Sequence, residues 1–572
     1  MSVVADRIDP TLPPSQRVAL AYERLGEEDR PEVWIDLRPE AEVLSDAHAV
    51  EQRLADGADL PLAGLLLAVK GNIDVAGLAT TAACPEFGAV AERSATTVRR
   101  LVDAGALVLG TTNLDQFATG LVGTRSPYGA VRCAWDPDRV SGGSSAGSAV
   151  AVALGVVDVA LGTDTAGSGR VPAALHDLVG IKATLGLVPT AGVVPACVDY
   201  DAVTVFAADL ATAAAAMRAM IGPDEEDPRS RSWPATVRLA ASPRPRVAVP
   251  RAEDLTALSP EFDAAFAATV DGLADRGIDT VTVDVSALLD AATLLYDGAV
   301  VAQRYAAVGA FLETEPASAD PTVAAIVRGA KAPAAHEYVT DLDRLTRVRA
   351  RAVRMLADVD ALLLPTTTEH PTIAAVQAEP VAINRRMGTF TNFCNLLDLA
   401  AVAVPGLPTA AGDPFGVMLV TDRFDDQVAV DLAARLVDEP APDLGAGGVD
   451  VLVVGAHLAG FPAHGQLTER GARFLGEVRT STAYRLRDLR TEPPKPGLVR
   501  VGGGGAEIAG ELYRLAPAHL GTFLAALPAP MGLGPVELSD GRWVTGFTCS
   551  QEAADAGTDI TEYGGWRAYR AR

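Results

Sequence analysis

One glycine- and serine-rich passage restricts the fold of this chain more than any other stretch. It begins with Ser141-Gly142-Gly143-Ser144-Ser145-Ala146-Gly147-Ser148 and ends with Gly162-Thr163-Asp164-Thr165-Ala166-Gly167-Ser168-Gly169-Arg170. The apolar run between them, residues 149–161, predicts a buried helix and then a short buried strand. Serines at the two ends of this unit can therefore lie close together. Glycines beside a serine let a carbonyl group approach closely, which is typical of a nucleophile flanked by oxyanion-binding amides.

A lysine upstream ends another apolar run. Residues 65–69 (Leu-Leu-Leu-Ala-Val) predict a fully buried strand that ends in Lys70 and turns at Gly71. An ammonium group in apolar surroundings is costly unless it is paired or neutral. Arginine keeps its proton at any workable pH, whereas a desolvated lysine can lose its proton and act as a base. A base at position 70 is therefore expected in a chain with only four lysines, namely Lys70, Lys182, Lys331 and Lys495.

These three elements make the chain resemble the amidase signature family, whose catalytic unit is a Lys-Ser-Ser triad. The resemblance implies that Lys70 is the base, Ser144 the bridging serine and Ser168 the nucleophile. The family more often has glycine where this chain has Ala146. Backbone N–H groups beside the nucleophile would form the oxyanion hole. The candidates are Thr165, Ala166 and Gly167, together with Ser168 itself.

A competing motif overlaps the first serine cluster. Residues 143–147 also satisfy Gly-x-Ser-x-Gly, the nucleophile elbow of α/β-hydrolases, which would make Ser145 the nucleophile of an esterase-like enzyme. That arrangement requires a strand directly before the motif and a histidine late in the chain. Residues 135–139 are turn-like, and His370 is the histidine that could serve. The elbow remains the alternative to the triad.

Four further segments resemble allophanate hydrolase, so that the resemblance covers nearly the whole chain. It implies hydrolysis of allophanate, the carboxylated urea made by a separate urea carboxylase, with release of ammonia and N-carboxycarbamate or carbon dioxide. It also associates the C-terminal domain with decarboxylation of N-carboxycarbamate. The segments are residues 80–85 (TTAACP), 123–129 (GTRSPYG), 391–399 (TNFCNLLDL) and 454–458 (VGAHL).

A substrate of this kind makes a physical demand on the site. Allophanate is a very small anion, so a cation must recognise its carboxylate. Tyr296 and Arg304 match the substrate-binding pair of the family in type and spacing. Residues 286–312 have helical periodicity, and a spacing of eight residues would place both side chains on roughly one helix face. The structural alternative is a solvated arginine beside a packed tyrosine.

The length of 572 residues predicts more than one domain. We expect an α/β amidase-signature domain over residues 1–438, with a helical segment up to about residue 60 and a central mixed sheet flanked by helices. Prolines and glycines mark residues 439–448 as a linker, and residues 449–572 as a smaller α+β domain. In that domain His457 follows a predicted strand, which makes it a candidate for either a catalytic or binding role or a structural one.

The remaining predictions concern individual elements. Helices are expected over residues 18–25, 41–54, 94–104 and 337–356, and strands over 107–109, 361–365 and 449–454. Residues 498–515 and 536–547 each predict a hairpin. Residues 222–245, rich in proline and acidic groups, predict a solvated surface excursion.

Bulk properties exclude several classes of partner. A net charge of −25 and a pI near 4.7 argue against a nucleic-acid partner, because phosphate binding needs a basic face. Five scattered cysteines and no membrane-spanning run indicate a cytoplasmic protein. The seven histidines lack metal-ligand spacing, so we expect neither a metal nor a cofactor. We also expect the protein to be a homodimer.

Three rival functions remain open. One is an amidase-signature amide hydrolase of different substrate. Another is the amidase component of a tRNA-dependent amidotransferase, against which the acidic balance and the additional C-terminal domain count. A third is a non-catalytic binding protein on the same scaffold, against which the joint presence of Lys70, Ser144 and Ser168 counts.

Overall fold

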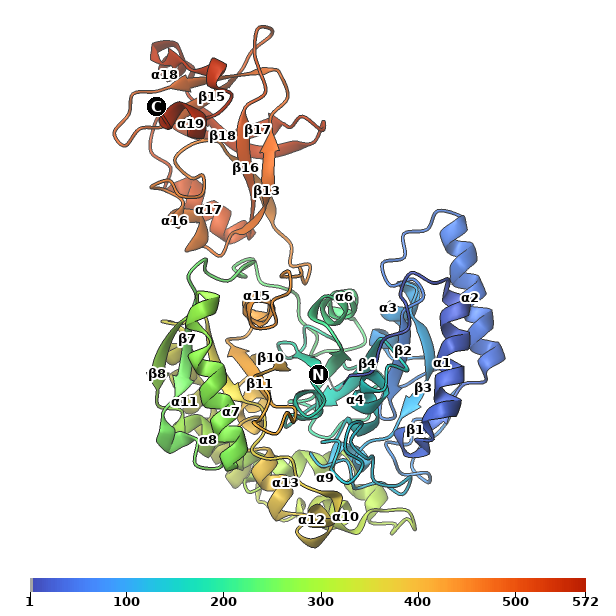
Figure 1. Ribbon diagram of the computed structural model, residues 1–572. Coiled ribbons are helices and arrows are strands. Elements are labelled where there is room, and N and C mark those ends of the chain that lie inside the picture. Colours follow the sequence, from blue (N-terminus) through green and yellow to red (C-terminus); the bar gives the residue numbers. More distant parts are fainter. Residues whose placement is uncertain (1–3) are drawn as a thin grey trace. The chain divides into compact units, whose positions relative to one another are not determined.

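The computed structural model describes residues 4–572, so the first three residues of the predicted N-terminal segment lie outside the described residues. The chain forms two compact units (Figure 1). The first contains the residues up to Ser232 together with Arg244–Leu444, and the second contains Trp233–Pro243 and Gly445–Arg572. Every helix in the described part of the chain is too short or too polar to span a bilayer.

The first unit is built on one eleven-stranded sheet, and the predicted central mixed sheet is confirmed. The strand order is β1-β3-β2-β4-β6-β5-β10-β11-β9-β7-β8. Parallel pairs lie on both sides of an antiparallel centre. The strands are β1 (Trp34–Leu37), β2 (Leu66–Lys70), β3 (Leu107–Thr112), β4 (Val159–Asp164), β5 (Val179–Lys182), β6 (Ala202–Ala207), β7 (Arg246–Pro250), β8 (Asp279–Val283), β9 (Ala361–Pro365), β10 (Ala400–Pro405) and β11 (Gly416–Thr421).

Helices flank this sheet in the first unit (Figure 1). They are α1 (Pro14–Glu28), α2 (Glu40–Ala55), α3 (Thr96–Asp103), α4 (Ala146–Ala153), α5 (Val171–Ala174), α6 (Leu210–Met220), α7 (Pro260–Asp271), α8 (Ser286–Ala292), α9 (Ala302–Leu312), α10 (Pro321–Gly329), α11 (Ala335–Leu356), α12 (Ile373–Ala378), α13 (Ala382–Met387), α14 (Asn392–Leu396) and α15 (Asp426–Leu436).

Strand β2 places the predicted base next to both serine clusters. All five of its residues are buried, as expected for a parallel strand covered on both faces. It lies between β3 and β4 and is parallel to each. Because parallel neighbours end at the same edge of a sheet, Lys70 at the end of β2 and the loop that follows β4 lie together. The predicted strand that ends in Lys70 is confirmed.

The helix between the serine clusters is completely buried. Helix α4 begins directly after Ser145, and all eight of its residues are buried. Small residues allow this close packing, since a Cβ atom on Gly147 would lie 2.2 Å from the Val33 carbonyl oxygen. The predicted sequence of buried helix and buried strand is confirmed by α4 and β4.

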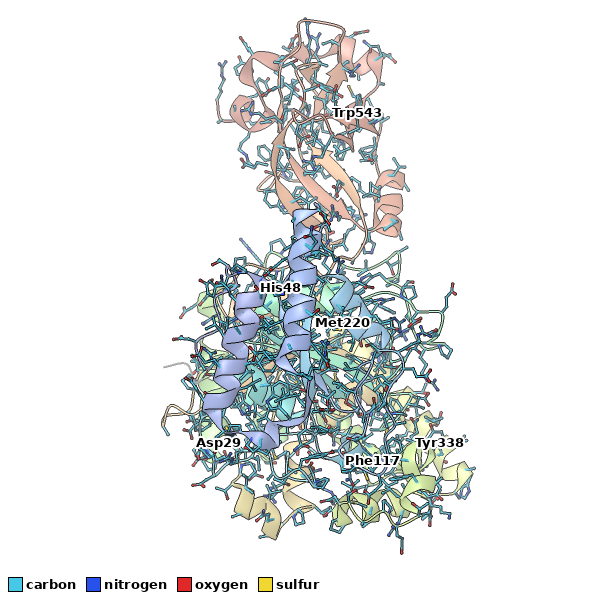
Figure 2. All side chains as sticks on the ribbon, turned by 90° about the vertical axis from the view of Figure 1, so that its right-hand side faces the viewer. Asp29, His48, Phe117, Met220, Tyr338 and Trp543 are labelled. Atoms are coloured by element: carbon cyan, nitrogen blue, oxygen red, sulfur yellow. The ribbon has the colours of Figure 1, made fainter. Side chains whose placement is uncertain are left out.

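The N-terminal helices are fixed to the sheet by a buried ion pair. Figure 2 shows α1 and α2 on one face of the first unit, with Asp29 at the end of α1 and His48 on α2. The Arg17 guanidinium on α1 donates to both carboxylate oxygens of Asp158 at 2.7 Å. Asp158 also accepts a hydrogen bond from the Leu66 amide at 2.8 Å. The N-terminal segment is thereby attached to the start of both β2 and β4.

The second unit has a five-stranded sheet in the order β13-β16-β12-β18-β17 and a three-stranded sheet in the order β15-β14-β19. Its own hydrophobic core includes Tyr484, Phe523 and Trp566. Its elements are β12 (Val449–Val453), α16 (Gly465–Thr468), β13 (Arg473–Arg479), β14 (Tyr484–Asp488), β15 (Pro496–Arg500), β16 (Ala509–Leu515), α17 (Pro517–Ala525), β17 (Met531–Glu537), β18 (Trp543–Cys549), α18 (Gln551–Ala556), β19 (Thr558–Asp559) and α19 (Trp566–Arg570).

Three predicted elements differ from the structure. Residues 286–312 are not one helix, because the chain breaks between α8 and α9. Residues 498–515 are not a hairpin, because β15 pairs with β14 whereas β16 pairs with β12 and β13. The predicted surface excursion is wrong for residues 233–243, which pack within the second unit. The hairpin over residues 536–547 is confirmed by the pairing of β17 with β18.

Candidate active site

Lys70 lies in a fully buried position at the end of β2. Its Nζ is 2.8 Å from Ser144 Oγ and 2.7 Å from Thr163 Oγ1. Thr163 belongs to the neighbouring strand β4, and its hydroxyl also accepts a hydrogen bond from Asn72 at 3.3 Å. The amino group therefore has two hydroxyl partners and no carboxylate in direct contact among the described residues.

Burial lowers the pKa of Lys70 from its ordinary value of 10.5 to about 7. Desolvation is the dominant cause, because water no longer stabilises the ammonium form. The carboxylates of Asp115, Asp164 and Asp201 act in the opposite direction and limit the fall. A substantial fraction of the amine is therefore neutral at neutral pH and can accept a proton.

Ser144 is held in the loop that precedes α4. Its side chain is fully buried. Its backbone carbonyl accepts a hydrogen bond from the Asp115 amide at 3.0 Å. Gly143 beside it cannot carry a side chain, since a Cβ atom there would lie 2.1 Å from Asp115 Oδ2. Contacts with Asp115 thereby hold the loop in place, and the Ser144 hydroxyl points toward Lys70.

Ser168 lies in the loop between β4 and α5 and is 2% exposed. In the part of the chain that the structure describes, no hydrogen bond joins its hydroxyl to that of Ser144. The structure thus shows the Lys70–Ser144 contact directly and places Ser168 in the adjoining loop.

The loop that carries Ser168 is shaped by Asp164. This carboxylate accepts hydrogen bonds from the Gly167 amide at 2.8 Å and the Gly169 amide at 3.0 Å. Gly167 has a φ of 128°, and a Cβ atom there would lie 2.3 Å from the Thr391 hydroxyl oxygen. Glycine is therefore required at this position.

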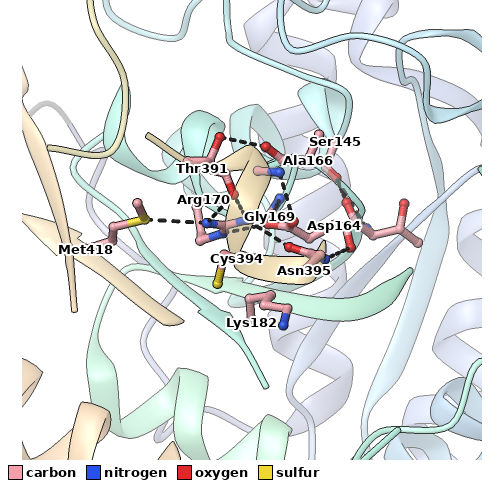
Figure 3. Close-up of polar contacts among 12 residues, drawn as sticks. Ser145, Asp164, Ala166, Gly169, Arg170, Lys182, Thr391, Cys394, Asn395 and Met418 are labelled. Atoms are coloured by element: carbon pink, nitrogen blue, oxygen red, sulfur yellow. Dashed lines mark hydrogen bonds and ion pairs between the residues drawn. The ribbon is translucent and has the colours of Figure 1, made fainter. Parts of the chain in front are cut away.

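The same carboxylate forms a buried ion pair with Arg170 (Figure 3). The guanidinium donates to both Asp164 oxygens at 2.9 Å and to the Thr391 carbonyl and the Asn395 side-chain oxygen. Proximity to Arg170 keeps the pKa of Asp164 below its ordinary value although burial acts to raise it. Arg170 is the last residue of the second cluster, but no local pattern in the sequence marks it as a functional residue.

The amide groups of this loop differ in their availability. The amides of Thr165, Ala166 and Ser168 donate to no residue in the described chain, so they are free to bind an oxyanion. The Gly167 amide already donates a hydrogen bond to the Asp164 carboxylate. Any oxyanion hole built on this geometry therefore uses the three free amides, and Gly167 contributes its backbone conformation.

Tyr296 and Arg304 contact each other, although by a different route from the one that helical spacing predicts. Tyr296 lies in the break after a 3₁₀ turn, Thr293–Leu295, and Arg304 lies on α9. Arg304 Nη2 donates to Tyr296 Oη at 3.1 Å, and Nη1 donates to Thr119 Oγ1 at 2.8 Å. Arg304 is 1% exposed and has no ion-pair partner among the described residues.

Asp201 is a further buried group that the sequence did not mark. It lies just before β6 and accepts hydrogen bonds from the Thr165 hydroxyl and the Ala196 amide. Burial raises the pKa of Asp201, while the Thr165 hydroxyl lowers it. An isolated aspartate in an ordinary stretch carries no motif, so only the folded chain reveals that it fixes Thr165 in the Ser168 loop.

The competing elbow receives no support from the geometry. No strand directly precedes Ser145, since the chain forms only isolated bridges there. The Ser145 hydroxyl donates to the Thr163 carbonyl at 3.1 Å. His370 lies 2.7 Å from the Val140 carbonyl through Nε2. Both side chains therefore interact with backbone carbonyl groups, and His370 does not act as a base beside Ser145.

His457 lines a pocket in the second unit. Its ring stacks on Phe547 with centroids 4.7 Å apart, and its Nε2 is 3.1 Å from Gln466 Oε1. Burial lowers the pKa of His457. Lys495 is the other basic residue of the lining, which contains no carboxylate among the described residues. The Lys495 ammonium forms no hydrogen bond or ion pair within residues 4–572.

No cluster of His, Cys, Asp and Glu side chains suited to a metal ion occurs among residues 4–572. The amine of Lys70, the hydroxyls of Ser144 and Ser168 and the backbone amides of the Ser168 loop suit nucleophilic attack on a carbonyl group.

Comparison with known proteins places this geometry in a family. Residues 30–430 match the Amidase family, and residues 449–571 match the allophanate hydrolase C-terminal domain family. The allophanate hydrolase of Kluyveromyces lactis has the same fold, with a TM-score of 0.87 and 38% identity over 100% of both chains.

Two curated relatives show how much of the chain each similarity covers. Urea amidolyase of Saccharomyces cerevisiae is 41% identical over 94% of this chain, which spans 31% of the length of that relative. The 2-amino-5-chloromuconic acid deaminase of Comamonas testosteroni is 33% identical over 66% of this chain and 82% of its own length. The chain thus belongs to the amidase signature family of amide hydrolases and joins its amidase domain to an allophanate hydrolase C-terminal domain.

Proposed function

We propose that Ser168 is the nucleophile, Ser144 the bridging serine and Lys70 the base of a Lys-Ser-Ser triad. The observation that carries this proposal is the contact of 2.8 Å between Lys70 Nζ and Ser144 Oγ at a fully buried position. The lowered pKa of Lys70, about 7, supports a neutral amine in that contact. A charged lysine could donate to Ser144 but could not take its proton.

The reaction then proceeds by two acyl transfers. Lys70 accepts the proton of Ser168 through Ser144, and Ser168 Oγ attacks the amide carbonyl carbon. The amides of Thr165, Ala166 and Ser168 stabilise the oxyanion. The relay returns the proton to the nitrogen as the C–N bond breaks and ammonia leaves. Water, activated by the same relay, hydrolyses the acyl-enzyme and restores Ser168.

We propose allophanate as the substrate. Arg304 is a buried cation that cannot lose its proton and has no carboxylate partner in the described chain, so it suits the carboxylate of a small anionic substrate. Tyr296 supplies a second donor beside it. The allophanate hydrolase of Kluyveromyces lactis has a matching fold over its full length.

Ammonia release from allophanate, urea, biuret and malonamide, measured side by side, tests the substrate proposal. We expect allophanate to give the highest kcat/KM by far. The Ser168→Ala enzyme should release no ammonia above background while its circular dichroism spectrum stays unchanged. Turnover by that variant would contradict the assignment of the nucleophile.

For the second unit we propose a decarboxylase role, in which the pocket around His457 binds N-carboxycarbamate. Loss of CO₂ breaks a C–N bond, leaves the electron pair on nitrogen and requires a proton there. His457 can exchange that proton, and the unpaired Lys495 can bind a carboxylate in a pocket without competing acids.

Substitution separates the two activities. His457→Asn and Lys495→Met should leave the initial rate of ammonia release unchanged and slow the appearance of CO₂, followed by ¹³C NMR of labelled allophanate. Unchanged CO₂ release in both variants would remove the pocket from the reaction and leave the second unit as an assembly module.

We also propose that a urea carboxylase supplies the substrate, because allophanate is the carboxylated form of urea and urea amidolyase is a relative of this chain. The expectations of a cytoplasmic homodimer belong to the same proposal. Sedimentation of the purified chain tests the dimer.

A further inference from the structure

One loop connects the two halves of the candidate active site. Residues 115–125 follow β3 and contact the Ser144 loop at one end, where the Asp115 amide donates to the Ser144 carbonyl at 3.0 Å. In its middle, the Thr119 hydroxyl accepts a hydrogen bond from Arg304 at 2.8 Å. The position of this loop therefore sets the separation between the triad and the cationic side chain.

The loop has an unfavourable backbone conformation. Phe117 and Ala118 both have φ of 51°, in the left-handed region that side chains other than glycine rarely occupy. Two consecutive residues of this kind persist only where the surroundings hold them in place. The residues that restrain the loop thus determine where Thr119 presents its hydroxyl.

Arg125 is one such restraint, and it contacts Thr119 directly. It is 3% exposed. Its Nη1 donates to the Thr119 carbonyl at 2.9 Å, and its Nη2 donates to the Pro380 carbonyl at 2.6 Å. No ion pair compensates its charge in the described part of the chain. Burying the Arg125 guanidinium carries a large desolvation penalty. If its only role were to link two carbonyl groups, a neutral donor could do so with a smaller penalty.

The chain of contacts runs without interruption from Arg125 to the substrate-binding pair. Arg125 holds the Thr119 carbonyl, the Thr119 hydroxyl holds Arg304, and Arg304 holds Tyr296. Thr119 itself is 1% exposed, so bulk water does not compete for either contact. Loss of the Arg125 side chain would free the Thr119 carbonyl, while the Asp115 carboxylate would still bind loop amides such as that of Gly123. The Thr119 hydroxyl that binds Arg304 would then lose its nearest restraint.

We propose that Arg125 is a positioning residue that sets the substrate length the site accepts, by fixing Arg304 through Thr119. The inference rests on the proposed role of Arg304 in binding the substrate carboxylate. A rigid distance between Arg304 and Ser168 selects anions of one length, because the carbonyl of a longer or shorter carboxylated amide would miss the nucleophile.

Steady-state kinetics of Arg125→Met test this role, with malonate, a dicarboxylate of similar length to allophanate, as a competitive inhibitor. A displacement of Arg304 should raise the allophanate KM and the malonate inhibition constant together, by about tenfold or more, with a smaller change in kcat. Arg125→Lys should recover only part of the loss, because a single ammonium cannot span both carbonyls.

A double-mutant cycle shows whether Arg125 acts through Thr119. Thr119→Val removes one hydroxyl at nearly constant volume, so it tests the relay even if Arg125→Met folds poorly. In the Arg125→Met/Thr119→Val enzyme, the change in malonate inhibition should be clearly smaller than the sum of the two single changes. Additive changes would overturn the proposal.

Arg100→Met provides the matched control. Arg100 also binds only backbone carbonyls, those of Met220, Gly222 and Pro223, and none of these residues contacts the site. The Arg100→Met enzyme should have lower thermal stability with unchanged KM and malonate inhibition.

Arg304→Met distinguishes a failure of the proposed function from a failure of this inference. If it leaves malonate inhibition unchanged, the proposed function fails; if it abolishes inhibition while Arg125→Met does not weaken it, only this inference fails.

Discussion

Lys70 and Arg304 present the same physical problem, a cation buried away from water, and the two side chains resolve it differently. Lysine can lose its proton, and burial lowers the pKa of Lys70 to about 7. Arginine cannot, so burial leaves Arg304 charged beside two hydroxyl groups. This difference supports the proposed roles, a base at Lys70 and an anion-binding cation at Arg304.

The pKa of Lys70 predicts the pH dependence of the reaction. In the proposed mechanism the neutral amine is the active form, so kcat/KM should rise with pH and level off above an apparent pKa near 7. Initial rates of ammonia release between pH 5.5 and 9 measure this rise of kcat/KM with pH. An activity that is constant across that range, or that falls as pH rises through 7, would contradict a lysine base.

The same shift predicts the effect of Lys70 on stability. The folded state binds a proton less tightly than the unfolded state, whose lysine has its ordinary value of 10.5. The buried amine therefore destabilises the fold fully below pH 7, and this effect disappears as pH rises toward 10.5. Lys70→Met should be inactive, and its stability relative to the natural chain should be greatest at low pH.

At this scale, the residues that could be predicted are those with an unusual local context. Lys70 ends an apolar run, and Ser144 and Ser168 lie among glycines, so the sequence marks all three. Asp201 and Thr119 lie in ordinary stretches and become significant only through contacts made across the fold. Their distance in sequence from the residues they hold leaves no local pattern.

At the scale of elements, the loop between β4 and α5 depends on one buried ion pair. Asp164 accepts two loop amides, and Arg170 neutralises its charge while binding the Thr391 carbonyl. Both side chains are fully buried. The pair thus joins the turn that carries Ser168 to the segment that begins α14.

Arg170→Met tests the contribution of this pair. It leaves the Asp164 carboxylate buried without a counter-charge, so the free energy of unfolding should fall by about 3–5 kcal/mol. Urea denaturation measures the change. The Asp164→Asn/Arg170→Met variant should recover part of the lost stability, because neither charge then remains, while its activity stays low. Equal stability of the natural chain and the single variant would contradict the argument.

The elements that could not be predicted fail for identifiable reasons. Periodicity over residues 286–312 continues across a break, because buried apolar residues also lie between α8 and α9, namely Leu294, Leu295, Ala299 and Val300. The glycines at 502–505 suggest a hairpin turn, yet strand partners are chosen by contacts distant in sequence, and β15 and β16 enter different sheets. Strands such as β2, buried on both faces, were evident from their apolar runs.

At the scale of the whole molecule, the second unit is not continuous in sequence. The segment Trp233–Pro243 belongs to it, although the chain on either side of that segment belongs to the first unit. Val237 and Leu239 are buried against Ala446 and Ala516. The Leu239 amide donates to the Gly471 carbonyl, and the Ala518 amide donates to the Ala235 carbonyl, both at 2.9 Å.

This arrangement predicts that a fragment of residues 445–572 is incomplete. Burial of a valine or leucine side chain stabilises a fold by about 1.5–3 kcal/mol, so loss of the segment removes a considerable part of the core around Ala446 and Ala516. A peptide of residues 231–245 should bind the fragment and raise its melting temperature in proportion to peptide concentration. A peptide with Val237→Ser and Leu239→Ser should not. If both peptides leave the melting temperature unchanged, the segment is dispensable; if only the first raises it, the second unit is assembled from two separate stretches of the chain, and cutting the chain at the predicted linker cannot release it intact.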